Sequence, residues 1–82
     1  YEIVVGKKTI PLTQKECMLL RLLIERDGDV VTRDEILDKI WGHETFPSNR
    51  TVDNVVLRIR KILKTSKYIH SVRGLGYKFQ AP

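Results

Sequence analysis

Two stretches of the sequence indicate the fold most clearly. They are residues 50–63, Arg-Thr-Val-Asp-Asn-Val-Val-Leu-Arg-Ile-Arg-Lys-Ile-Leu, and residues 71–79, Ser-Val-Arg-Gly-Leu-Gly-Tyr-Lys-Phe. The first stretch has the apolar spacing of an amphipathic helix with a basic outer face. In the second, two closely spaced glycines interrupt strand-forming residues, which is typical of a tight hairpin. Such a helix fits the major groove of duplex DNA, and a hairpin with an arginine at its tip fits the minor groove. Together the two stretches predict a DNA-binding module.

The helix predicted over residues 49–64 has two opposite faces. On a wheel of about 100° per residue, one arc of about 60° holds the apolar residues Val52, Val56, Ile59 and Leu63. An arc of about 80° on the other side holds Thr51, Asn54, Arg58 and Lys61. Arginine bonds a guanine edge, asparagine an adenine edge, and threonine offers a hydroxyl and a methyl group. A merely solvated face would carry acids for pairing along the helix, and only Asp53 is present.

Neighbouring residues extend this predicted DNA-binding face. Arg50 at the helix start and Arg60 on its flank are placed for phosphates, and the amides of the helix N-terminus add to the same anion site. Val55 lies at the edge of the apolar stripe, and Leu57 lies opposite that stripe. Single exposed apolar residues are common. Our hypothesis is that Val55 meets a thymine methyl group and that Leu57 contacts DNA or a partner protein.

The hairpin predicted over residues 69–80 brings an arginine to its tip. Side chains alternate along a strand, so Ser71 and Arg73 share one face. Gly74 and Gly76 permit a tight turn with unusual dihedral angles. Arg73 would then enter an A/T-rich minor groove, where the negative potential is enhanced, and the hydroxyls of Ser71 and Tyr77 would bond phosphates. An ordinary solvated hairpin is the alternative, and the neighbouring helix favours DNA binding.

Length and charge agree with a small binding domain. The chain has 82 residues, enough for one domain, and no apolar run approaches the roughly 18 residues of a membrane span. Its net charge is +5. Most acids lie in residues 25–38, whereas Asp53 is the only one from Arg50 onward, so the positive field belongs to the C-terminal half. The single Cys17 excludes an internal disulfide and suggests a buried small residue of a cytosolic protein.

The part before the third helix predicts strands over residues 1–5 and 9–12 and helices over residues 14–26 and 33–41. Capping-box spacing at Thr13–Glu16 and Thr32–Glu35 marks where the two helices begin. The inward residues of the first are predicted to be Cys17, Leu20, Leu23 and Ile24, and those of the second Ile36, Leu37 and Ile40. The first hairpin is expected to belong to a sheet that continues upstream. The sequence thus predicts one α+β domain, with three helices between two hairpins.

Four motifs, in their order and spacing, resemble the effector domain of OmpR/PhoB-type response regulators. They are Leu12-Thr-x-x-Glu16, Val31-Thr-Arg-Asp-Glu-Ile-Leu-x-x-Ile-Trp-Gly42, Arg50-Thr-Val-Asp53 and Val72-Arg-Gly-x-Gly-Tyr77. The resemblance covers nearly the whole chain and implies a winged helix-turn-helix that binds promoter DNA, often as a tandem dimer on direct repeats. It also implies transcription regulation in the bacterial cytoplasm, within a two-component system whose phosphoacceptor domain lies upstream.

The resemblance and the helix wheel together assign the candidate site. Base contacts are expected from Thr51, Asn54, Val55, Arg58 and Arg73. Contacts to the DNA backbone are expected from Trp41, Arg50, Arg60, Lys61, Ser71 and Tyr77. A loop that touches RNA polymerase in some members matches His43, Glu44, Thr45 and Phe46. Trp41 is expected to serve mainly as core, with a secondary phosphate contact through its indole N–H. Val55 and Leu57 depart from the family, whose members often carry polar or basic residues there.

Three other functions compete with DNA binding as explanations of this sequence. An enzyme is disfavoured because His43 and His70 have no metal-ligand spacing to Cys17 and no nucleophile or phosphate-loop motif occurs; no cofactor or metal is expected. An RNA-binding domain is disfavoured because the deep, narrow major groove of A-form RNA would not admit the helix. The runner-up is a winged helix that binds proteins without specific DNA binding, although such domains lose or cover the basic face that this chain retains.

Overall fold

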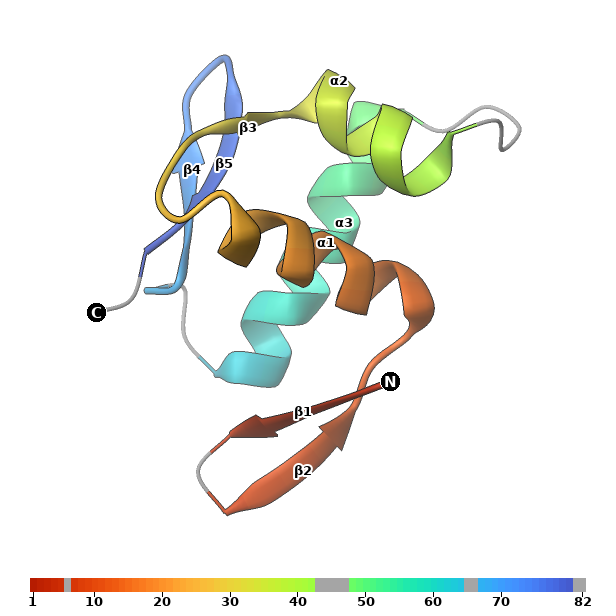
Figure 1. Cartoon of the computed structure of the whole chain (residues 1–82), viewed down its shortest axis with the longest axis vertical. Helices are drawn as coiled ribbons and strands as arrows, with labels where there is room; N and C mark the ends of the chain where they lie inside the picture. Colours follow the sequence, from red (N-terminus) through yellow and green to blue (C-terminus); the bar gives the residue numbers. More distant parts are fainter. Residues whose placement is uncertain (6, 43–47, 65–66, 81–82) are drawn as a thin grey trace.

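Three helical segments pack together with two antiparallel sheets, one of two strands near the N-terminus and one of three strands that includes the C-terminal hairpin (Figure 1). The computed structural model describes residues 1–5, 7–42, 48–64 and 67–80. Its elements are β1 (Glu2–Val5), β2 (Lys8–Pro11), α1 (Gln14–Glu25), β3 (Val31–Thr32), α2 (Arg33–Ile36), η1 (Leu37–Trp41), α3 (Asn49–Leu63), β4 (Ile69–Val72) and β5 (Gly76–Phe79). The predicted α+β winged helix-turn-helix is confirmed, with β4 and β5 as the wing.

Capping residues determine where the first two helices begin. The Thr13 hydroxyl accepts a hydrogen bond from the Glu16 amide at 3.2 Å, and the Glu16 carboxylate accepts one from the Thr13 amide at 2.9 Å. The predicted capping box therefore opens α1. At α2 the Thr32 hydroxyl accepts from the Glu35 amide at 3.1 Å, as predicted, while the Glu35 carboxylate pairs with basic side chains outside the cap.

The second helix continues from α2 into the π-helical turn η1. The Gly42 amide donates to the Leu37 carbonyl at 2.8 Å, a bond that spans five residues and is the mark of π-helical geometry. Gly42 has a φ of 53°, which ends the segment at the predicted residue. Together α2 and η1 cover the predicted helix over residues 33–41.

The second sheet has three strands, in the order β3-β5-β4. Val31 pairs with Tyr77 and Thr32 with Gly76, so the wing is joined to the residues that precede α2. The sequence predicted no strand between the first two helices, so β3 (Val31–Thr32) was missed. A strand of two residues is too short to show an alternating pattern in the sequence. It forms because it pairs with β5, more than 40 residues further along the chain.

Gly76 is needed for close packing between β3 and β5. A Cβ atom added there would lie 2.1 Å from the Val31 carbonyl oxygen and 2.9 Å from the Thr32 Cα. Gly74, in the turn of the wing, has a φ of 78°, which is the unusual dihedral predicted for it. The two glycines therefore serve different purposes, and the predicted dihedral reason holds for Gly74 alone.

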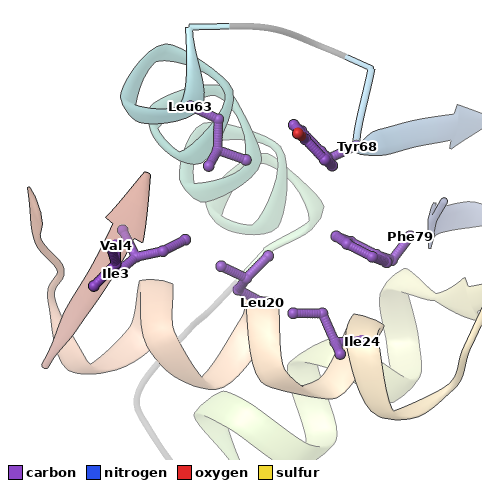
Figure 2. A pocket seen from close by; sticks show the side chains of 7 residues that line it. All are labelled: Ile3, Val4, Leu20, Ile24, Leu63, Tyr68 and Phe79. Atoms are coloured by element: carbon purple, nitrogen blue, oxygen red, sulfur yellow. The ribbon is translucent and has the colours of Figure 1, made fainter. Parts of the chain in front are cut away.

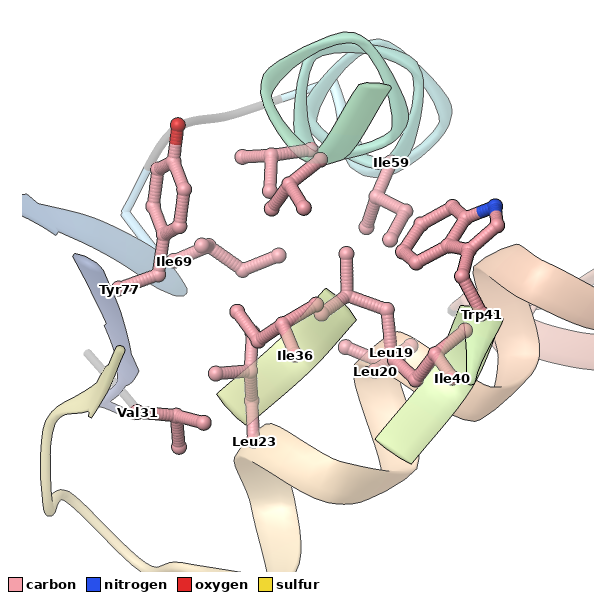
Figure 3. Packing of buried hydrophobic residues seen from close by; sticks show 12 residues of the cluster. Leu19, Leu20, Leu23, Val31, Ile36, Ile40, Trp41, Ile59, Ile69 and Tyr77 are labelled. Atoms are coloured by element: carbon pink, nitrogen blue, oxygen red, sulfur yellow. The ribbon is translucent and has the colours of Figure 1, made fainter. Parts of the chain in front are cut away.

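The core lies where the three helices meet the second sheet (Figure 3). Its buried members are Leu19, Leu20, Leu23, Val31, Ile36, Ile40, Trp41, Val52, Val56, Ile59, Ile69 and Tyr77. The inward stripe predicted for α3 is confirmed, with Leu63 partly buried at its end. In α1 the predicted stripe was partly wrong, because Leu19 is fully buried while Ile24 is 47% exposed. Ile24 instead lines an apolar pocket beside β1.

Candidate nucleic-acid interface

The outer face of α3 presents polar and basic side chains. Arg50, Asn54, Arg58 and Lys61 are exposed, and they lie on the side of α3 away from its buried stripe. Thr51 is half-buried at the first turn, where its hydroxyl accepts from the Ser48 amide at 3.2 Å. Ser48 is thus the N-cap of α3. The basic face predicted for this helix is present on the surface.

The two apolar residues predicted outside the core stripe differ in their surroundings. Leu57 is 52% exposed on α3, which makes it one of the large apolar side chains that face solvent. Val55 is half-buried and packs against the core cluster. About half of the Leu57 side chain is therefore accessible to a partner, whereas Val55 is partly covered by the core.

Arg58 is held by a carboxylate from another helix. Its Nε donates to Glu16 Oε2 at 2.6 Å, and Glu16 itself is 2% exposed. Burial alone would raise the pKa of Glu16, but the bonds from the Thr13 amide and from Arg58 outweigh it, so the pKa lies below its ordinary value. Sequence reasoning identified Glu16 as a cap and missed this second role, because the partners lie far apart in the chain.

Asp53 joins α3 to α2 and to the wing. Its Oδ1 accepts from Arg33 Nε at 2.9 Å and from the Tyr77 hydroxyl at 2.5 Å. The Arg33 guanidinium also lies over the Tyr77 ring, 5.3 Å from its centroid. This three-residue group holds the wing at a defined position relative to α3. Asp53 and Arg33 were not predicted as site residues, and no local motif signals their contact.

Hydrogen bonding and charge set the pKa values of this group. Partial burial would raise the pKa of Asp53, but the bonds from Tyr77 and Arg33 outweigh it and hold the pKa below its ordinary value. Burial, and next the bond to Asp53, raises the pKa of the Tyr77 phenol. The same carboxylate raises the pKa of Arg33. At neutral pH the group is therefore an ionised acid, an ionised base and a neutral phenol.

Asp53→Asn is expected to lower the free energy of unfolding by up to about 1 kcal/mol at pH 7, because a charged acceptor of two hydrogen bonds is lost. The Asp53 side chain is 40% exposed, so solvent screening keeps the effect small. The folded-state pKa lies below the unfolded value of about 4. The carboxylate therefore stabilises the fold above that pH, and the contribution disappears as the pH falls through the folded-state pKa.

Urea unfolding of the wild type and of Asp53→Asn at pH 7 and pH 3 measures this contribution. Glu16 titrates in both proteins, so its own contribution cancels in the difference between them. The difference in unfolding free energy should shrink at pH 3. An equal difference at both pH values would contradict the assignment of the stabilisation to the ionised carboxylate.

Arg60 connects α3 to the first strand of the wing. Its Nη2 donates to the Ile69 carbonyl at 2.7 Å and to the Ser71 hydroxyl at 3.1 Å, and its Nε reaches the same carbonyl at 3.2 Å. The guanidinium lies 5.8 Å from the Tyr77 ring centroid. Arg60 and Ser71, both expected at phosphates, are thus brought together and bond each other.

Arg73 is exposed in the turn between β4 and β5. The turn is closed by the Leu75 amide, which donates to the Val72 carbonyl at 3.0 Å. The Leu75 carbonyl in turn accepts from the Arg33 amide at 3.4 Å, which ties the turn to the start of α2. Arg73 therefore projects from a turn that is hydrogen-bonded to β4 and to the first residue of α2.

Two of the expected phosphate contacts are core residues with polar tips. Trp41 is 8% exposed and Tyr77 is 4% exposed. In Figure 3 the indole nitrogen of Trp41 and the hydroxyl of Tyr77 lie at the margin of the apolar cluster, directed away from its centre. Core packing, the main role expected for Trp41, is confirmed. The loop expected at RNA polymerase, His43, Glu44, Thr45 and Phe46, lies outside the described residues.

An apolar pocket of about 260 Å³ lies between β1, α1 and the C-terminal end of α3 (Figure 2). It is lined by Ile3, Val4, Leu20, Ile24, Leu63, Tyr68 and Phe79. Tyr68 carries the one polar side-chain atom of this lining, whereas specific small-molecule sites combine an apolar wall with several converging polar groups. Among the described residues no cluster of His, Cys, Asp and Glu is arranged to hold a metal ion. None of the described helices combines the length and the hydropathy of a membrane span.

A family described as "Transcriptional regulatory protein, C terminal" matches residues 6–79. The chain is 44% identical to the transcriptional regulatory protein VxrB of Vibrio cholerae over 80 residues, covering 98% of this chain and 32% of that protein. It is 45% identical to the heme response regulator HssR of Staphylococcus epidermidis, covering 94% of this chain and 36% of that protein. The chain thus spans about a third of the length of these relatives.

Solved structures agree with these matches. The DNA-binding domain of Bacillus subtilis CssR superposes with a TM-score of 0.86 at 35% identity, covering 96% of this chain and 90% of that one. The DNA-binding domain of the response regulator AdeR, solved in complex with an intercistronic region, gives a TM-score of 0.84 at 27% identity, covering 99% and 86%. The likeness extends over β1 to β5 and includes a domain captured on DNA.

Proposed function

The chain belongs to the OmpR/PhoB-type family of transcriptional regulatory C-terminal domains, the DNA-binding output domains of response regulators, and on that premise we propose how it engages its operator. Helix α3 enters the major groove, and the wing of β4 and β5 enters the adjacent minor groove. The observation that carries this proposal is the exposed face of Asn54, Arg58 and Lys61 on α3, beside a wing anchored to the same helix through Asp53.

The side chains divide between bases and phosphates. We assign base contacts to Thr51, Asn54, Val55, Arg58 and Arg73. Phosphate contacts fall chiefly to Arg50 and Lys61, which are exposed on α3. Arg60, Ser71, Tyr77 and Trp41 keep a lesser share of the phosphate contacts. The first two bond each other, and the other two are largely buried.

The partners beyond a single duplex site follow the family pattern. We propose that protomers bind in tandem on direct repeats about one helical turn apart, and that residues 43–46 contact RNA polymerase. We place the protein in the bacterial cytoplasm, where its operator lies. The family is one of DNA-binding regulatory domains and is no enzyme class, and we propose no catalytic activity for this chain.

Selection of random duplex DNA by this chain at low salt tests the proposal. We expect enrichment of a short motif, repeated directly at one-turn spacing. Binding without an enriched motif would contradict sequence-specific recognition. No binding to any duplex would favour the runner-up, a winged helix that contacts proteins.

Arg58→Ala is expected to cost about 1–3 kcal/mol of affinity for the selected sequence and to relax the preference at one base pair. The reason is the loss of a bidentate contact to a guanine edge. Fluorescence anisotropy on duplexes that differ at single base pairs measures both effects. Arg21→Ala is the charge-matched control, because Arg21 is an exposed arginine of α1 beside the first hairpin. An equal loss on all sequences would make Arg58 a phosphate contact instead.

A further inference from the structure

Glu16 is the only charged residue among the described ones that is buried, at 2% exposed. Taking a carboxylate out of water is costly unless hydrogen bonds and an opposite charge compensate it. Both Glu16 oxygens are occupied: Oε1 accepts from the Thr13 amide at 2.9 Å, and Oε2 accepts from Arg58 Nε at 2.6 Å. One side chain therefore serves as the cap of α1 and as the counter-charge of a residue on α3.

Capping alone does not account for the second bond. A capping box needs a single acceptor oxygen at this position, and glutamine supplies it as well as glutamate. The chain offers an internal comparison in Glu35, which occupies the same position in α2 and pairs with Arg26 and Lys39 on the surface. Glu16 differs by being buried and by reaching 42 residues along the sequence to Arg58.

The bond to Glu16 constrains the Arg58 side chain and leaves most of its guanidinium N–H groups available. The Arg58 side chain is 67% exposed, and its single Nε proton is the one directed at Glu16. The four N–H groups on Nη1 and Nη2 belong to the outer end of the planar fork, which is the part that bonds a guanine edge in bidentate fashion. A free arginine has many rotamers to lose on binding, and one held at Nε has fewer.

We propose that Glu16 is a positioning residue for base recognition: from α1 it fixes the fork of Arg58 in the orientation that reads a base pair. This rests on the proposed function, in which Arg58 contacts a base. Glu16 does not touch DNA itself. Its carboxylate restricts the rotamers of Arg58, so that the N–H groups on Nη1 and Nη2 point toward the base. The phosphate contacts of α3 do not depend on this bond.

Glu16→Gln tests the proposal, because it keeps an acceptor for the Thr13 amide and removes the charge that holds Arg58. The ratio of affinities for the selected duplex and for a duplex changed at the Arg58-dependent base pair should fall about two- to tenfold, the size expected for ordering one long side chain. Affinity for a random-sequence duplex should stay the same or rise slightly, since one negative charge is lost. Glu35→Gln is the matched control: it removes a charge at the same cap position and should leave the ratio unchanged.

A double variant separates positioning from a structural role. In an Arg58→Ala background, Glu16→Gln should have no further effect on the ratio. An additive effect there, or an equal loss on selected and random duplexes, would overturn the proposal and make Glu16 merely structural. A gain on the selected duplex would also overturn it, because Glu16 would then compete with DNA for Arg58. If Arg58→Ala itself leaves the ratio unchanged, the base contact fails and the proposed function with it.

Discussion

Gly76→Ala is expected to destabilise the domain by about 3 kcal/mol, the upper part of the range for inserting a methyl group into a packed interior. The new Cβ would lie 2.1 Å from the Val31 carbonyl oxygen, and both atoms belong to paired strands with no flexible side chain to give way. Strand β5 would have to move away from β3, and Tyr77 would move with it. A domain of this length has a total free energy of unfolding of about 4–12 kcal/mol, so the expected loss is a large fraction of the total.

Gly74→Ala is the control for this prediction. It makes the same chemical change two residues earlier, where a Cβ would meet no atom within 4 Å. Its cost should come only from a φ of 78°, about 1–2 kcal/mol. Urea unfolding of both variants measures the two free energies. If Gly74→Ala proved as damaging as Gly76→Ala, close packing between β3 and β5 would not be the reason for the glycine at position 76.

Raising the salt concentration from 50 to 200 mM is expected to weaken DNA binding about 500-fold. The proposed interface brings five cations to the duplex, namely Arg50, Arg58, Arg60, Lys61 and Arg73. Each positive charge brought to the duplex neutralises about one phosphate charge and releases its counterions, whether the side chain itself bonds a phosphate or a base. Five charges therefore predict a slope of about −4.5 for log K against log salt. The dependence should be similar on selected and random duplexes, because phosphates carry no sequence information.

Anisotropy titrations at four or five salt concentrations give the slope. Lys61→Ala should flatten it by about one unit, whereas Arg21→Ala, on α1, should leave it unchanged. Arg60→Ala is informative as well: its guanidinium bonds the Ile69 carbonyl and Ser71, so a change in slope smaller than that of Lys61→Ala would follow from its engagement within the protein. A slope near zero would contradict an interface built on phosphate contacts.

The features predicted correctly from the sequence are local ones. The cap at Thr13, the end of the second helix at Gly42 and the buried stripe of Val52, Val56 and Ile59 all follow from spacings within a turn or two of helix. The exposure of Asn54, Arg58 and Lys61 followed from the same periodicity. The base contacts assigned to these side chains stay a prediction.

The features that escaped prediction depend on partners distant in sequence. The bond from Arg58 to Glu16 spans 42 residues, and those from Tyr77 and Arg33 to Asp53 span 24 and 20. Strand β3 exists only through its pairing with β5. Periodicity also placed Ile24 in the core in place of Leu19, since both residues border the apolar stripe of α1 and tertiary packing decides between them.

The contacts of Asp53 and Arg58 limit how the domain can acquire a new operator. Grafting a foreign recognition helix onto this scaffold would leave Glu16, Arg33 and Tyr77 without partners unless the donor also carried an acid at position 53 and an arginine at 58. The positions open to divergence are those whose side chains face outward without such ties, among them Asn54, Leu57 and Lys61. Changes of DNA specificity are therefore expected to arise from substitutions at those positions. The remaining residues of α3 are constrained by their contacts with the rest of the domain.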